Sequence, residues 1–123
     1  MPRKRIGSFS TEIINALELN IPVGTPIYIA DSTISHMKTS HPEDFRKYSC
    51  DIESIIANPD YAGKNLKDDS IEFTKEYILN GDFVKAAVRV SLQNIYYARS
   101  LYTLNSNRVK NFIAKGTLKK LDK

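Results

Sequence analysis

The sequence predicts an α+β fold in which helices come first, an antiparallel sheet follows, and a last helix closes the domain. Two observations predict it. Before residue 60, apolar residues recur at helical spacing between capping residues and prolines, and after residue 70 they alternate with polar residues as in strands. The 123 residues suffice for one domain, which we expect to span 1–123. Cys50 is the only cysteine, so the fold does not depend on an internal disulfide.

The N-terminal half predicts short helices around one buried strand. Residues 1–8 form a basic arm that we expect to be flexible, and Ser10 then caps a helix that ends near Leu19. Residues 27–30 predict a short buried strand, and residues 31–33 supply caps for the next helix.

A break between two helices follows at Pro42. Proline disfavours helical geometry at His41 and suits the first position of a new helix. A further short helix begins at Asp51 and ends near residue 58, and the polar segment 61–69 predicts a loop.

Residues 70–79 and 82–90 predict a β-hairpin, because Asn80-Gly81 is a strong signal for a two-residue turn. That turn pairs Leu79 with Asp82 and fixes the register of both strands. The register sets apolar opposite apolar and acid opposite base residues, in the pairs Ile71–Val90, Phe73–Val88, Tyr77–Val84, Glu72–Arg89 and Glu76–Lys85.

Residues 95–104 predict a third strand whose facing has two solutions. If Gln93-Asn94 forms another two-residue turn, Ser100 and Tyr102 join the polar face of the sheet. The same register puts Arg99 on the apolar face, where a guanidinium is unfavourable. An odd loop length reverses the assignment, and the sequence leaves both solutions open.

The last helix, over residues 105–115, lies in a basic segment and is ended by Gly116. No Asp or Glu occurs from residue 83 to residue 121. A cationic half on a small domain attracts polyanions, of which phosphate backbones are the commonest in a cell. The alternative is a solvated basic surface without a partner.

Absent signals exclude several function classes. One Cys and two His are too few for a structural zinc site, and no segment has transmembrane length. The chain also lacks a Gly-rich phosphate loop and a Gly-x-Ser-x-Gly elbow. We expect no metal, no cofactor and no membrane partner. We expect a cytoplasmic site of action, although a domain cut from a larger phage or secreted protein would look the same.

The histidines are the first candidates for proton transfer, since imidazole gives and takes protons near neutral pH. On one continuous helix, His36 and His41 would point about 140° apart, so a shared role requires the break before Pro42. A surface or capping role is the alternative for each. Glu72 beside Arg89 is a second candidate, in which the carboxylate takes a proton while the guanidinium holds a phosphate. An inert salt bridge is the alternative there.

Tyrosines among basic residues offer stacking surfaces for unpaired bases, and the chain has seven tyrosines and no tryptophan. The candidates are Tyr48, Tyr61, Tyr96, Tyr97 and Tyr102. Core packing explains Tyr28 and Tyr77 better.

Short motifs follow one another over roughly residues 20–121. They are Ile27-Tyr28-Ile29-Ala30-Asp31-Ser32, His36-Met-Lys-Thr-Ser-His41-Pro42, Ile52-Glu-Ser-Ile-Ile56, Asn58-Pro59-Asp60-Tyr61, Ser70-Ile71-Glu72, Ala87-Val88-Arg89, Ala98-Arg99-Ser100-Leu101-Tyr102 and Asn111-Phe112-Ile113-Ala114-Lys115-Gly116-Thr117-Leu118-Lys119-Lys120. In this order and spacing they resemble the phage and bacterial barnase–EndoU–colicin–RelE-like nucleases. The resemblance implies N-terminal helices packed on a four-stranded antiparallel sheet, with a C-terminal helix. It also implies metal-independent RNA cleavage in toxin, phage-conflict or RNA-processing roles.

The resemblance also marks site residues. The active-site positions are His36, His41, Glu72, Arg89, Arg99, Ser100 and Tyr102. Apart from the positions that the resemblance marks, we expect RNA binding by Lys38, Tyr48, Lys85, Lys115, Thr117, Lys119 and Lys120. The expected partners are RNA, with tRNA as one candidate, and an acidic immunity or antitoxin protein that the basic C-terminal segment would bind.

From these residues we expect a ribose 2′-OH to attack the adjacent phosphorus and leave a 2′,3′-cyclic phosphate. His36 or Glu72 is the expected base and His41 the expected acid. Arg89 and Arg99 are expected to hold the phosphate, with Ser100 and Tyr102 as further donors. The alternative is an inactive RNA- or protein-binding module on the same scaffold.

Overall fold

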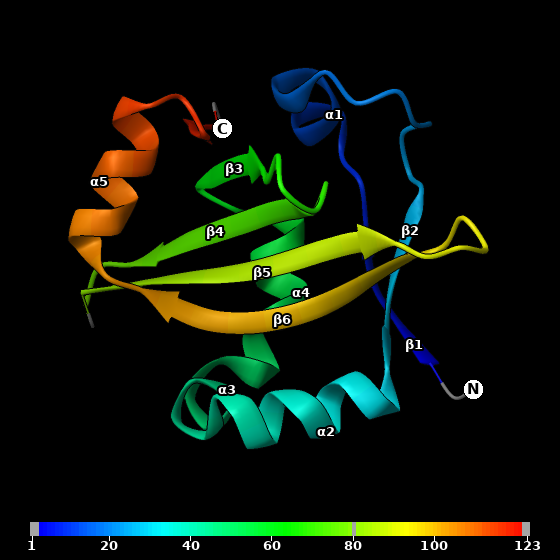
Figure 1. Ribbon diagram of the computed structural model, residues 1–123, viewed down its shortest axis with the longest axis horizontal. Coiled ribbons are helices and arrows are strands. Elements are labelled where there is room, and N and C mark those ends of the chain that lie inside the picture. Colours follow the sequence, from blue (N-terminus) through cyan, green and yellow to red (C-terminus); the bar gives the residue numbers. More distant parts are fainter. Residues whose placement is uncertain (1–2, 80, 122–123) are drawn as a thin grey trace.

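A seven-stranded mixed sheet runs through the computed structural model, which describes residues 3–79 and 81–121 (Figure 1). Its strands are β1 (Arg3–Ser8), β2 (Pro26–Ala30), β3 (Tyr61–Lys64), β4 (Ile71–Tyr77), β5 (Asp82–Val90), β6 (Tyr96–Leu104) and β7 (Leu118–Lys120). Their order across the sheet is β1-β2-β6-β5-β4-β3-β7, and β2 pairs with β6 in parallel. The helices are α1 (Thr11–Leu17), α2 (Asp31–Ser40), α3 (Pro42–Tyr48), a 3₁₀ turn (Ser49–Asp51), α4 (Ile52–Ala57) and α5 (Ser106–Ala114). The predicted α+β class is confirmed.

The sheet has more strands than the four antiparallel ones that the resemblance implied. The arm predicted to be flexible is strand β1 over residues 3–8, because it pairs antiparallel with β2 and buries Ile6. Met1 and Pro2 lie outside the described residues. The predicted loop 61–69 contains β3, and β7 extends the sheet beyond it. Gly63 permits this last pairing, since a Cβ there would lie 2.3 Å from the carbonyl oxygen of Thr117.

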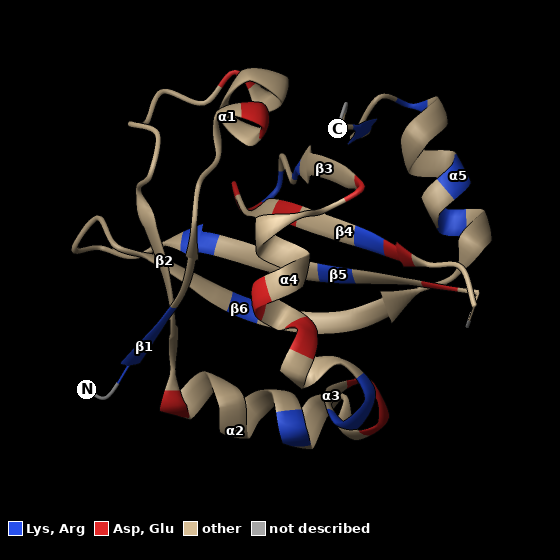
Figure 2. Cartoon of the chain, turned by 180° about the vertical axis from the view of Figure 1, so that it is seen from behind, with Lys and Arg blue, Asp and Glu red and all other residues tan. Residues whose placement is uncertain are grey.

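The two faces of the sheet differ in chemistry. The apolar face carries Phe73, Val84 and Val88. These side chains share one core with Ile13 of α1 and Ile55 of α4. Seen from behind, α4 crosses in front of β5 and β6 (Figure 2). The opposite face, which we call the polar face, carries Glu72, Thr74, Lys85, Ser100 and Tyr102.

Helices also flank the polar face and the edge of β6. α5 packs Val109 against Leu104 and Leu118 at one end of the polar face. α2 and α3 lie along the outer edge of β6 (Figure 1). The Asp44 carboxylate accepts a hydrogen bond from the backbone N–H of Thr103 at 2.9 Å and so occupies part of that edge.

The predicted register of β4 and β5 is wrong by two residues. Tyr77 pairs with Asp82, so residues 78–81 form the connection, and Asn80 of the predicted turn lies outside the described residues. Glu72 therefore lies opposite Ala87 rather than Arg89. A shift of two residues keeps every side chain on its predicted face and changes only its partner.

Contacts beyond the hairpin account for the longer connection. The Tyr77 hydroxyl donates to Asp51 at 3.1 Å, and the Tyr48 hydroxyl donates to Asp82 at 2.5 Å. Both contacts tie the ends of the two strands to the segment around the 3₁₀ turn. Gly81 closes the connection with φ of 70°.

The open question about β6 is resolved by a β-bulge. Lys85 pairs with Tyr102 and Ala87 with Ser100, as the two-residue turn requires. The next pair is Val88 with Ala98, so Arg99 is the extra residue of the bulge. The bulge keeps Arg99 exposed, although its neighbour Ala98 is fully buried.

Candidate active site

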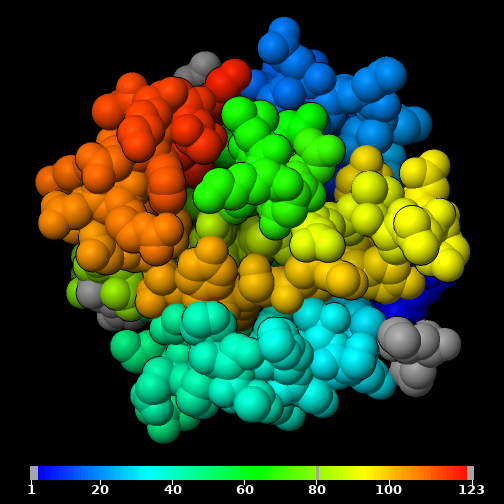
Figure 3. All heavy atoms as spheres, in the orientation of Figure 1, coloured from blue at the N-terminus to red at the C-terminus, as the bar shows by residue number. Residues whose placement is uncertain are grey.

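Two groups of polar side chains lie along the boundary between α2 and β6, which we call the α2–β6 seam. In Figure 3 the cyan atoms of α2 and α3 lie directly along the gold atoms of β6. The first group surrounds a hollow of about 370 Å³ that is lined by Ser32, Thr33, His36 and Arg99. Helical spacing stacks the two hydroxyls one turn before the imidazole, and the bulge of β6 supplies the guanidinium. Hydroxyl, imidazole and guanidinium groups are all donors that suit a phosphate.

The side chains of this hollow are accessible. Both His36 and Arg99 are exposed, and within the described residues Arg99 forms no ion pair. His36 Nε2 lies 3.3 Å from the Ser40 hydroxyl oxygen, one turn along α2. The N-cap of α2 is Ala30, which has no side-chain acceptor for the first-turn N–H groups. The hollow is thus rich in donors for an anion.

The second group begins with His41, where α2 ends and α3 begins. Its backbone leaves helical geometry, with φ of −139° and ψ of 66°. The imidazole stacks on the Tyr102 ring, with centroids 5.3 Å apart and planes inclined by 22°. His41 is the N-cap residue of α3, as the alternative role requires: its carbonyl oxygen accepts a hydrogen bond from the backbone N–H of Phe45 at 2.9 Å, while its side chain forms no cap hydrogen bond.

A buried ion pair also lies next to Tyr102. Lys85 Nζ donates to Glu72 Oε2 at 2.8 Å, and the two side chains are 8% and 11% exposed. The same Nζ lies 4.9 Å from the Tyr102 ring centroid. Burial disfavours the ammonium, but hydrogen bonds to Glu72 and Tyr102 outweigh it and raise the pKa of Lys85. Thr74 is opposite Lys85 in register, and its buried hydroxyl is without a hydrogen-bond partner in the described chain.

Three predicted assignments are corrected by these contacts. Glu72 pairs with Lys85 instead of Arg89, because the hairpin register differs by two residues. Arg89 forms an ion pair with Asp68, with Nη1 3.8 Å from Oδ2, and belongs to neither of the two groups along the α2–β6 seam. Tyr48 is 2% exposed, so it cannot stack on an RNA base.

Other predicted site residues lie near the seam. Ser100 is half-buried on the polar face, opposite Ala87. Lys38 is exposed on α2, with its Nζ 5.6 Å from the Phe45 ring centroid.

The remaining predicted RNA-binding residues lie far from the seam, at the β7 end of the sheet (Figure 1). A hollow of about 250 Å³ there is lined by Leu17, Lys64, Leu66, Lys115, Gly116, Thr117 and Lys119. Lys119 Nζ donates to the carbonyl oxygen of Ala16 in α1 at 3.2 Å. Lys120 lines a neighbouring hollow beside Glu12. These residues cannot contact the same nucleotide as His36.

Ser32 and Thr33 line the candidate site, although the sequence predicted them only as helix caps. Their signal was available, since they precede His36 by four and three residues and therefore share its helix face.

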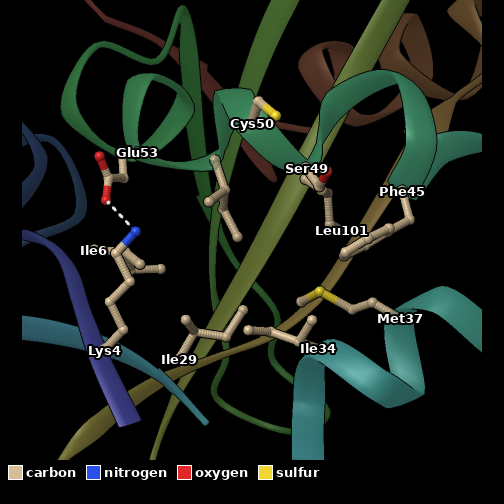
Figure 4. Close-up of a pocket in the computed structure, with 11 residues that line it drawn as sticks. Lys4, Ile6, Ile29, Ile34, Met37, Phe45, Ser49, Cys50, Glu53 and Leu101 are labelled. Carbon is tan, nitrogen blue, oxygen red and sulfur yellow. Dashed lines mark ion pairs between the residues drawn. The ribbon is translucent and has the colours of Figure 1, made fainter. Parts of the chain in front are cut away.

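Another hollow, of about 340 Å³, lies under α2 on the apolar face (Figure 4). Apolar side chains from Ile29, Ile34, Met37 and Leu101 dominate it, and a Lys4–Glu53 ion pair of 3.5 Å lies at its side. None of the predicted site residues lines this hollow.

The potential metal ligands of the described residues are dispersed. In residues 3–79 and 81–121, no three His, Cys, Asp or Glu side chains are grouped in that way. The described helices are all too short or too polar to cross a bilayer.

The α+β fold brings the His36 imidazole and the Arg99 guanidinium to one hollow, an arrangement that suits phosphate-ester chemistry. A family model described as phage-Barnase-EndoU-ColicinE5/D-RelE like nuclease3 matches residues 4–111, and the chain belongs to this nuclease family. The resemblance is thereby confirmed, and the family implies a nucleic-acid substrate. No curated protein and no solved structure matches the chain.

Proposed function

We propose that this protein is a metal-independent endoribonuclease that cleaves RNA at the α2–β6 seam. One observation carries the proposal: His36 and Arg99 line the same exposed hollow. An imidazole can move a proton there while a guanidinium without an ion-pair partner among the described residues binds the phosphate. His41, five residues further along the chain, would complete the acid–base pair.

The proposed reaction is a transesterification within the RNA. His36 takes the proton from the ribose 2′-OH, and the 2′-oxygen forms a bond to the adjacent phosphorus. The bond from phosphorus to the 5′-oxygen breaks, and His41 gives that oxygen a proton. The products are a 2′,3′-cyclic phosphate and a 5′-hydroxyl. Arg99 stabilises the added negative charge of the transition state.

His36 is preferred over Glu72 as the base because of the buried ion pair. Glu72 accepts a hydrogen bond from Lys85 at 2.8 Å and is nearly inaccessible. A base must reach the proton that it removes. Lys85 instead supports Tyr102, which donates to the substrate beside His41. Ser100, between Arg99 and Tyr102 on β6, can supply a further hydroxyl.

The positions of the two histidines support a division of labour between them. In-line transfer requires the base and the acid on opposite sides of the phosphorus. His36 lines the hollow, whereas His41 has left the helix and stacks on Tyr102.

Cleavage of an RNA oligonucleotide in excess chelator tests the proposal. Mass spectrometry of the fragments should find 2′,3′-cyclic phosphate and 5′-hydroxyl ends at an unchanged rate without divalent metal. Activity that requires added Mg²⁺ or Mn²⁺, or fragments with 5′-phosphate ends, would contradict it.

A second candidate is an inactive binding module for RNA or protein. The Lys85–Glu72 pair favours it, since the two charges neutralise each other within the candidate site. For this candidate, RNA binding survives His36→Ala and His41→Ala, and the parent protein cleaves nothing under any condition.

The proposed biological role is that of a toxin or phage-conflict effector that acts on cytoplasmic RNA, with tRNA as one candidate. The nuclease family supports this role. The acid-free segment 83–121 would also bind an acidic immunity or antitoxin protein. Growth arrest on induced expression, relieved by His41→Ala, tests the role. Salt-sensitive capture of an acidic partner tests the interaction.

A further inference from the structure

A group of basic and aromatic side chains lies on the polar face at the β1 edge of the sheet, outside the two groups of the seam. Its members are Arg3, Arg5, Tyr28, Tyr97 and Arg89, which we call the β1 platform. From the sequence, the first two belong to an arm expected to be flexible, and Tyr28 is expected to be a core residue. Strand β1 brings them together, because Arg5 pairs with Tyr28 in the sheet.

Strand alternation sets both tyrosines on the polar face. The neighbours of Tyr28 along β2, Ile27 and Ile29, are buried on the apolar face. Tyr96 packs edge-on against the core residue Phe9 at 4.9 Å, so Tyr97 points the other way. Tyr28 and Tyr97 themselves are only half-buried. Each tyrosine therefore keeps part of its surface in solvent.

The two rings and one guanidinium are in direct contact. The ring centroids of Tyr28 and Tyr97 are 6.3 Å apart. The guanidinium carbon of Arg3 lies 4.3 Å from the Tyr28 ring centroid, and its Nη1 donates to the Tyr97 hydroxyl at 3.3 Å. This contact orders the rings, while the charge of Arg3 stays exposed.

Further positive charge flanks the rings. Arg89 is the register partner of Tyr97, and Arg5 is the partner of Tyr28. Both arginines are exposed. In the described residues Arg5 forms no ion pair. The first half of β1, which contains Arg3 and Arg5, is blue in Figure 2.

Aromatic rings interleaved with cations are the recognition chemistry of single-stranded nucleic acid, in which bases stack on rings and phosphates contact the cations. A duplex keeps its bases stacked inside and cannot use such rings. The β1 platform is continuous with the candidate active site, since Tyr97 precedes Arg99 by two residues on β6. Tyr28 likewise leads through Ala30 into α2.

We infer that the β1 platform binds unpaired nucleotides of the RNA next to the scissile one, an inference that rests on the proposed ribonuclease function. The substrate is then a single-stranded segment rather than a duplex. Tyr28 and Tyr97 supply stacking, and the arginines bind the adjoining phosphates.

Binding of a fluorescent, uncleavable 2′-O-methyl oligonucleotide tests the inference separately from catalysis. We expect Tyr97→Leu to weaken binding by about tenfold, at the lower end of the usual contribution of one stacked base. Tyr97→Phe keeps the ring and loses the Arg3 hydrogen bond, so it should bind like the parent. We expect a duplex of the same sequence to bind more weakly than the single strand.

Salt dependence gives a second readout that does not depend on the packing of β1. Arg5→Ala should lower the magnitude of the log–log salt slope by about 0.7, the value for one phosphate of a single strand. The matched control is Lys47→Ala, which removes an exposed cation from α3 and should leave the slope unchanged.

Each outcome has one meaning. If Tyr97→Leu, folded by its melting curve, and Arg5→Ala both bind like the parent, the platform merely anchors β1 and the inference fails. If the platform variants lose binding but the parent protein never cleaves RNA, the platform is a single-strand binding surface, and both the proposed function and its place beside a scissile nucleotide fail.

Discussion

The imidazole of His41 stacks on the ring of Tyr102 at a centroid distance of 5.3 Å, and Lys85 Nζ lies 4.9 Å from the same ring. One tyrosine thus connects an exposed imidazole with a buried ammonium that is paired to Glu72. Among the described residues, stacking on Tyr102 is the side-chain contact that orients the His41 ring. This contact depends on the packing of β6 against the break that separates α2 from α3.

Replacing His41 separates its stacking from its chemistry. His41→Phe retains an aromatic ring against Tyr102, and His41→Ala does not. Both variants lack the proton donor, so we expect each to lose roughly 100- to 10,000-fold in cleavage rate. The melting temperature should fall for His41→Ala and change little for His41→Phe. Substantial activity in either variant would exclude His41 as the acid.

Arg99 should act on the reaction with little effect on stability, because its side chain is exposed and free of ion pairs among the described residues. We expect Arg99→Ala to lower kcat by about 100-fold or more, as expected for loss of a cation at the developing charge. Urea unfolding should change by less than about 0.5 kcal/mol, typical of a surface substitution. Lys47→Ala, with the same loss of charge elsewhere, should alter neither quantity.

Removing one partner of the Lys85–Glu72 pair should destabilise the fold strongly, whereas replacing both partners by apolar side chains should destabilise it little. Lys85→Met leaves a buried carboxylate without its partner, so we expect unfolding free energy to fall by about 3–5 kcal/mol. Adding Glu72→Leu should recover most of that loss, since two apolar side chains then pack together.

The exposed Glu43–Arg46 pair on α3 serves as the control for this comparison. Arg46→Met should cost less than about 1 kcal/mol. Equal losses for Arg46→Met and Lys85→Met in urea unfolding would mean that the buried pair has no special role.

Alkaline pH should destabilise the fold through two groups. Burial opposes the charge of Lys85, but Glu72 and Tyr102 raise its pKa above the ordinary 10.5, and burial together with Asp51 raises the pKa of Tyr77 above the ordinary 10.0. Between the unfolded-state and folded-state pKa values of each group, the folded protein holds a proton that the unfolded chain has released. Their contribution is therefore complete below pH 10 and is lost as pH rises through the folded-state pKa values.

Unfolding measured from pH 8 to pH 12 checks this expectation. Stability should decline above pH 10 in the parent protein, and Tyr77→Phe, which cannot ionise, should show a shallower decline. A decline of the same slope in Tyr77→Phe would mean that Tyr77 does not contribute.

In β4 and β5, the sequence predicts the sheet face of each side chain better than its cross-strand partner. Alternation in residues 70–90 predicts which side chains of β4 and β5 share a face, and a two-residue shift leaves this intact. It cannot predict that Glu72 meets Lys85, because the connection after Tyr77 is held by contacts with Asp51 and Tyr48, which come from another part of the chain.

Non-local pairing also explains the strands that were missed. The arm 3–8 contains little that predicts a strand, and its pairing with β2 depends on a partner about 20 residues away. The sequence indicates the bulge at Arg99 only indirectly, because no regular strand puts Arg99 in solvent while Ser100 and Tyr102 lie on the polar face. For the candidate site, the sequence proposed residues of α2 and β6, but their grouping into two neighbouring sets required the fold.

The most direct test of the account uses two RNA oligonucleotides that differ only by a 2′-deoxy sugar at the mapped cleavage site, incubated with the protein in chelator. Attack by the 2′-oxygen predicts that the all-ribose strand is cut and that the substituted strand stays intact at that position. Cleavage of both strands at equal rates would show that the 2′-hydroxyl takes no part, and the proposed mechanism would be wrong.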